Sequence, residues 1–182
     1  MKFFSVIVLC LSLGLATCDF ECFSRAMVEC NVKGFEERKS ERPADGEKKI
    51  CQDNLLIAKC MRDSAAQCNT GFAGVAERVY KAVMDICTEG TEEYNAIKSD
   101  PKCGVETLTD IGTCADEIKK EPNNIRFGDV TEMMRVICRH IDGIKNCMYE
   151  KFEKCTVRTQ EVFKYAMELY AEVQKGTCAI LP

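Results

Sequence analysis

The stretch ICQDNLLIAKCMRDSAAQC, residues 50–68, occurs twice in this chain, and its second copy is ICRHIDGIKNCMYEKFEKC, residues 137–155. Ile, Cys, Ile, Cys, Met and Cys recur in both at identical offsets. At about 100° per residue, Ile50, Ile57, Met61 and Cys68 fall on one line, which predicts an amphipathic helix. Cys51 and Cys60 lie on opposite flanks of that line. We therefore expect disulfides to join this helix to different neighbours.

The cysteine spacing extends the repeat over the whole chain. The steps between consecutive cysteines are 8, 21, 9, 8 and 19 in the first set and 11, 24, 9, 8 and 23 in the second. The two sets are Cys22, Cys30, Cys51, Cys60, Cys68 and Cys87, then Cys103, Cys114, Cys138, Cys147, Cys155 and Cys178. This predicts two tandem six-cysteine units, 19–95 and 96–182, joined by the polar segment 88–102. Spacing leaves the connectivity open, but the repeat predicts the same pairing in each half.

Each unit is predicted to contain three helices. The expected helices are Phe20–Arg38, a central helix from near Asp45, and Phe72–Cys87 in the first unit, then Cys103–Lys120, a central helix from near Asp129, and Thr159–Val173 in the second. No alternating runs of Val, Ile and Thr predict strands. The sequence thus predicts an all-α, disulfide-rich helical bundle. Three short helices bury little apolar surface, so we expect the two units to pack as one compact body.

The N-terminus predicts a secreted protein. Residues 1–18, MKFFSVIVLCLSLGLATC, have one Lys, an apolar run and a small-residue end, which is typical of a signal peptide. A signal anchor is the alternative. Cleavage after Cys18 leaves twelve cysteines, an even number that favours six disulfides, whereas cleavage after Ala16 would keep Cys18 as an odd thiol. No later stretch is long and apolar enough to predict a membrane span.

Charge and composition exclude several function classes. The chain carries a net charge of −4, with acidic and basic residues interspersed, which argues against a nucleic-acid partner. Cysteines without a C-x2-C pair, and a single His, predict no metal or other cofactor. No nucleotide-binding or hydrolase motif occurs, so we expect a non-catalytic protein.

His140 carries the one remote catalytic alternative, a secreted hydrolase. The segment CRHIDGIKNC, residues 138–147, resembles the helix of secreted phospholipases A2, which would make His140 a general base beside Asp142. It departs from that family because one Ile separates His from Asp, the cysteines are not adjacent, and a Gly-rich calcium loop is missing. We therefore favour a polar His on a helix surface.

Two binding functions remain. The first is presentation of a rigid surface to an unknown extracellular protein, as a signal, venom or body-fluid component. The second is carriage of a small apolar ligand between helices. Methionine and aromatic side chains are most simply core residues, but they also mark a candidate apolar pocket, which we place at Met134, Met148, Phe152, Phe163 and Met167.

The cysteine pattern also resembles a known family. The signal peptide, the twelve cysteines across residues 22–178 and the C-x8-C-x7-C core of each half are similar to a secreted nematode and arthropod helical domain of unknown function, which includes haemolymph glycoproteins. This resemblance implies an extracellular non-enzyme and transfers no catalytic residue. Odorant-binding proteins and saposin-like modules are excluded, since the early C-x3-C and the paired initial cysteines are missing.

Overall fold

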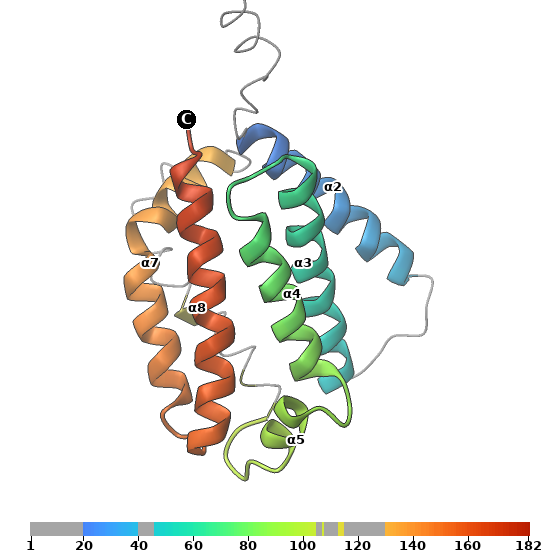
Figure 1. Cartoon of the computed structure of the whole chain (residues 1–182), viewed down its shortest axis with the longest axis vertical. Coiled ribbons are helices and arrows are strands. Elements are labelled where there is room, and N and C mark those ends of the chain that lie inside the picture. The colour runs from blue at the N-terminus through green and yellow to red at the C-terminus, as the bar shows by residue number, and fades with distance from the viewer. Residues whose placement is uncertain (1–19, 40–45, 105–106, 108–112, 115–129) are drawn as a thin grey trace, which may run out of the picture.

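The computed structural model describes residues 20–39, 46–104, 107, 113–114 and 130–182, and all of its regular structure is helical (Figure 1). The helices are α2 (Phe20–Lys39), α3 (Glu47–Gln67), α4 (Ala73–Cys87), α5 (Glu92–Lys98), α7 (Val130–Phe152) and α8 (Val157–Ala179). The predicted all-α, disulfide-rich fold class is confirmed. The predicted signal peptide lies outside the described residues.

Helix α3 is the central element of the first unit, packed between α2 and α4. Of the line predicted from the repeat, Met61 and Cys68 are buried, whereas Ile57 is exposed. Ala58 and Ala65, which lie beside that line, complete the buried face. Cys51 joins α3 to α4 through Cys87, while Cys60 joins the opposite flank of α3 to α2. The prediction that the two flanks are held to different neighbours is therefore confirmed.

The two halves share one disulfide pattern, in which the first cysteine pairs with the fifth, the second with the fourth and the third with the sixth. The pairs are Cys22–Cys68, Cys30–Cys60 and Cys51–Cys87, then Cys103–Cys155, Cys114–Cys147 and Cys138–Cys178. They close loops with sequence separations of 30 to 52 residues. Loop-closure entropy gives roughly 3–4 kcal/mol for each such loop. All six pairs lie within a unit, so contacts between the units are non-covalent.

The second unit is described by the hairpin of α7 and α8, which pack side by side. Helix α8 begins at Val157, two residues before the predicted start, because the Thr156 hydroxyl caps its first turn by accepting a hydrogen bond from the Thr159 amide. It ends at Ala179, beyond the predicted Val173. The start of the predicted helix 103–120 is wrong, since Cys103 is not helical; most of that segment lies outside the described residues. Asp129, where α7 was predicted to begin, also lies outside them.

Helices α4 and α8 pack against one another and join the two units. Close to the C-terminal end of α8, Gly176 faces the ring of Phe72, which precedes α4. A Cβ placed on Gly176 would lie 2.5 Å from Phe72 Cδ1, so a side chain here would collide with the ring. Phe72 is itself buried and meets Phe23 of α2 edge to face, with ring centroids 5.2 Å apart. The interface thus depends on a glycine that lets α8 approach the first unit.

The segment predicted as a plain polar join contains the short helix α5, which contacts both α4 and α8. The Thr91 hydroxyl caps α5 by accepting a hydrogen bond from the Tyr94 amide at 3.1 Å. After α5, the Asp100 carboxylate accepts hydrogen bonds from the amide and hydroxyl of Thr156, both at 2.8 Å. The join therefore fixes the first unit to the beginning of α8.

Asp100 is held as an anion by these contacts. Burial by itself raises the pKa of this carboxyl, but hydrogen bonds from the Lys102 amide and from Thr156 outweigh that effect. The resulting pKa lies well below the usual range for aspartate. A negative charge at the N-terminus of α8 also interacts favourably with the helix dipole.

Candidate ligand-binding groove

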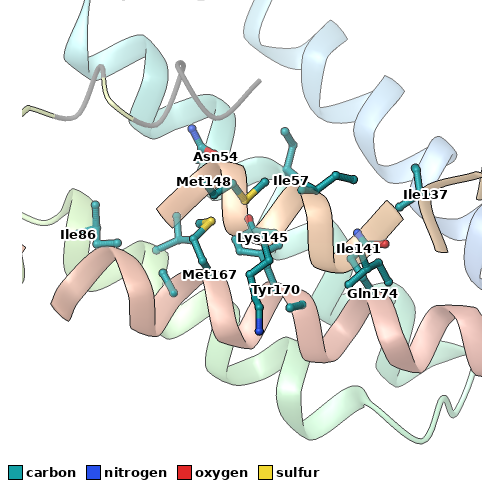
Figure 2. Close-up of a pocket in the computed structure, with 14 residues that line it drawn as sticks. Asn54, Ile57, Ile86, Ile137, Ile141, Lys145, Met148, Met167, Tyr170 and Gln174 are labelled. Atoms are coloured by element: carbon teal, nitrogen blue, oxygen red, sulfur yellow. The ribbon is translucent and has the colours of Figure 1, made fainter. Parts of the chain in front are cut away.

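An apolar groove of about 310 Å³ lies where the two units meet. Figure 2 shows side chains from α3, α4, α7 and α8 converging on it. Its volume is at the lower end of the range for small-molecule sites, roughly 300–1,000 Å³. The aliphatic and methionine side chains that line it are Ile57, Val83, Ile86, Ile137, Ile141, Ile144, Met148, Ala166, Met167 and Ala171.

The repeated stripe supplies part of this lining. Ile57 of α3 and Ile144 of α7 occupy equivalent positions in the two copies, and both border the groove. Ile57 remains 36% exposed and Ile144 is half-buried, although a helix stripe of this kind predicts core residues. For Ile144 the difference arises because α7 packs on α8, so its stripe is only partly covered by the first unit.

Four polar side chains also border the groove: Asn54, Lys145, Tyr170 and Gln174. The Asn54 amide nitrogen donates a hydrogen bond to the Ile50 carbonyl oxygen at 2.9 Å, within α3. Lys145 Nζ lies 3.6 Å from the Glu168 carboxylate. The charge at this position is therefore neutralised within the protein.

Glu168 is bound on a second side by Tyr149, whose hydroxyl donates a hydrogen bond to it. That bond is the main reason why the pKa of Glu168 is lowered. Burial opposes the shift, and the attraction of Lys145 adds to it. Burial and the same bond raise the pKa of Tyr149 to about 12. The three side chains form a neutralised cluster beside the groove.

Tyr170 and Gln174 lie one turn apart on α8, both bordering the groove. Burial raises the pKa of Tyr170 to about 12, so its hydroxyl is protonated at neutral pH. Among the residues that the structure describes, none provides a hydrogen-bond partner for that hydroxyl. Gln174 Oε1 is buried and likewise accepts no hydrogen bond from the described part of the protein. These two groups are candidates for hydrogen bonds to a ligand.

The structure separates the five residues of the predicted pocket. Met148 and Met167 line the groove. Phe152 and Phe163 do not: both are fully buried and stack on each other, with ring centroids 4.7 Å apart. Phe152 ends α7, where the chain turns directly back into α8, so its ring is enclosed within the hairpin. Met134 is half-buried on α7 and is not among the groove-lining side chains.

The sequence marked Tyr170 as one of the aromatic side chains that could line an apolar pocket, and it does line the groove. It did not identify Ile141, Lys145 or Gln174 as groove residues. The spacing of four between Tyr170 and Gln174 was visible, but the predicted helix ended at Val173. The hydrophobic periodicity of the sequence does not predict which face of α7 and α8 the first unit leaves uncovered. Sequence patterns therefore could not identify residues that only the packing of the two units brings together.

The remaining candidate sites are separate from the groove. His140 is half-buried on α7 and is not among the side chains that line the groove. The hydrolase hypothesis stays a prediction. Asp100, Cys103 and Cys155 bring potential metal ligands together in the described part of the chain. The two sulfurs are joined in a disulfide, however, and so lack the thiolates that bind metals.

Comparison with protein families, curated proteins and solved structures finds no match to this chain. The resemblance to the nematode and arthropod domain stays a prediction. Among the described residues, no helix combines the length and apolar character needed to cross a membrane.

Proposed function

We propose that this chain is a secreted, non-catalytic protein that binds a small apolar ligand in the groove between its two units. The observation that carries the proposal is the groove itself, with its aliphatic lining and few polar side chains. Such a composition is typical of sites that bind small molecules. The six disulfides support an oxidising, extracellular location for this activity.

The disulfides also support binding through pre-organisation. Each wall of the groove is anchored: Cys51–Cys87 joins α3 to α4, and Cys138–Cys178 joins α7 to α8. A wall held in its bound shape loses little conformational entropy when a ligand enters. The reversible binding expected of a carrier can then follow from apolar burial at about 25 cal/mol for each Å² removed from water.

The size of the groove favours a small ligand over a protein. Specific protein interfaces bury about 800 Å² on each partner, and their central side chains need a broad, accessible surface. A concave site of about 310 Å³ instead has the size to accommodate one compact apolar molecule. The hypothesis of an extracellular protein partner remains a prediction and forms the contrary outcome of the experiment below.

The experiment fills the groove. Ala171→Phe adds a ring to a groove-lining position of α8, whereas Ala179→Phe makes the same change at an exposed position of that helix. We expect the oxidised wild-type protein and Ala179→Phe to bind the uncharged fluorescent probe phenylnaphthylamine with equal affinity. Ala171→Phe should weaken that binding at least tenfold while leaving the helical circular dichroism unchanged. Equal binding by all three proteins, or no binding by the wild type, would refute the proposal.

A further inference from the structure

Among the lining residues that the structure describes, the groove has no free charge to select an ionic ligand. Its one cationic lining residue, Lys145, is paired with Glu168, and Glu168 is also bound by the Tyr149 hydroxyl. A ligand carboxylate would have to compete with this internal anion for the ammonium group. An incoming cation would be repelled by Lys145. Both kinds of ionic head group would also lose their hydration on entering an apolar site.

Gln174 and Tyr170 have complementary hydrogen-bonding roles in the groove. Gln174 Oε1 is an acceptor that is buried without a donor from the described part of the protein. The Tyr170 hydroxyl is a donor one helical turn away, on the same face of α8. A buried acceptor without a partner is unfavourable, so a ligand that supplies a donor relieves this penalty. Figure 2 shows both side chains beside the apolar lining.

We propose that the ligand is an uncharged amphiphile with an aliphatic body and a hydroxyl group, which donates a hydrogen bond to Gln174 Oε1 and accepts one from the Tyr170 hydroxyl. This inference rests on the proposed function and specifies the chemical class that the groove selects. An alcohol matches the pair because its single oxygen both donates and accepts. A carboxylate only accepts, and a hydrocarbon does neither.

The test compares three probes that share one chain length: dodecanol, dodecanoate and dodecane. Each is titrated against the protein loaded with phenylnaphthylamine, at neutral pH and below its solubility limit. Gln174→Leu and Tyr170→Phe remove the two polar groups with little change of shape. Gln52→Leu and Tyr165→Phe make the same substitutions at exposed positions outside the groove.

We expect dodecanol to bind the wild type at least about fivefold more tightly than dodecanoate. Gln174→Leu should weaken dodecanol about fivefold, and Tyr170→Phe by a smaller factor, since the hydroxyl is less enclosed. The affinity of dodecane for Gln174→Leu and for Tyr170→Phe should equal or exceed its affinity for the wild type. The two control variants should match the wild type with every probe.

The outcomes separate this inference from the proposed function. If phenylnaphthylamine binds and Ala171→Phe blocks it, but Gln174→Leu does not change the affinity for dodecanol, the groove binds apolar molecules and the assignment of the hydroxyl is wrong. Tighter binding of dodecanoate than of dodecanol would also overturn the assignment, in favour of an anionic ligand. If no probe binds, the proposed function itself fails.

Discussion

Gly176→Ala should destabilise the protein, although alanine favours helices over glycine. The new Cβ would lie 2.5 Å from Phe72 Cδ1, 2.8 Å from Cγ and 2.9 Å from Cβ. Contact with Cγ and Cβ means that rotation of the ring cannot remove the clash. The ring is 4% exposed and its other side meets Phe23, so it has no free space to enter. Either α8 or the chain before α4 must shift.

The magnitude follows from two opposing effects. Overpacking in a buried contact costs about 1–3 kcal/mol. Replacing glycine by alanine inside a helix contributes about 1 kcal/mol in the other direction. We therefore expect a net loss of up to about 2 kcal/mol in the free energy of unfolding. Gly143→Ala provides the matched control, because a Cβ at Gly143 of α7 would meet nothing within 4 Å. That variant should gain up to about 1 kcal/mol.

Guanidinium unfolding of the oxidised proteins, followed by circular dichroism, measures both changes. Phe72→Leu in the background of Gly176→Ala should recover part of the loss, since a smaller side chain gives the new methyl group space. The reasoning fails if Gly176→Ala is stabilised to the same extent as Gly143→Ala. That result would mean that α8 does not approach the first unit as closely as described.

The other predictions concern the core, the join and the cross-links. Phe152→Ala should lower the free energy of unfolding by about 3–5 kcal/mol, because Phe152 is fully buried against Phe163; a loss below 1 kcal/mol by denaturant titration would contradict this. Asp100→Asn should lower it by about 1–2 kcal/mol at pH 7 through weaker bonds to Thr156. The lowered pKa of Asp100 means that its contribution is present above about pH 4 and is lost as the pH falls below that value, so the variant should show a shallower acid dependence in thermal melts. Full reduction should abolish the cooperative thermal transition, as judged by calorimetry with and without a reductant.

Much of the fold was predictable because it follows from local periodicity and cysteine spacing. Helix α2 ends at Lys39, one residue beyond the prediction, and α4 ends at Cys87 as predicted. Identical offsets of the inner cysteines required identical surroundings, which is why both halves use one pairing. The helix α5 was missed because its residues are mostly polar and its burial depends on a single side chain, Ile97.

The groove was less predictable, for a physical reason. Met148 and Phe152 lie one turn apart on α7, and helical periodicity treats them alike. Only the position of the neighbouring helices distinguishes them, since Phe152 is enclosed by the hairpin while Met148 meets the groove. Tyr170 and Gln174 become groove residues through the packing of α8 beside α4, which local sequence patterns do not encode.

Each of the six described disulfides is confined to its own half, and this determines how that part of the chain comes apart. One proteolytic cut between Cys87 and Cys103 breaks no covalent loop, so the two pieces separate in denaturant without any reductant. A cut between Cys30 and Cys51 instead leaves fragments that remain tethered until their sulfurs are reduced. Mass spectrometry of nicked material would distinguish the two cases, and each half could be exchanged between proteins without rewiring a disulfide.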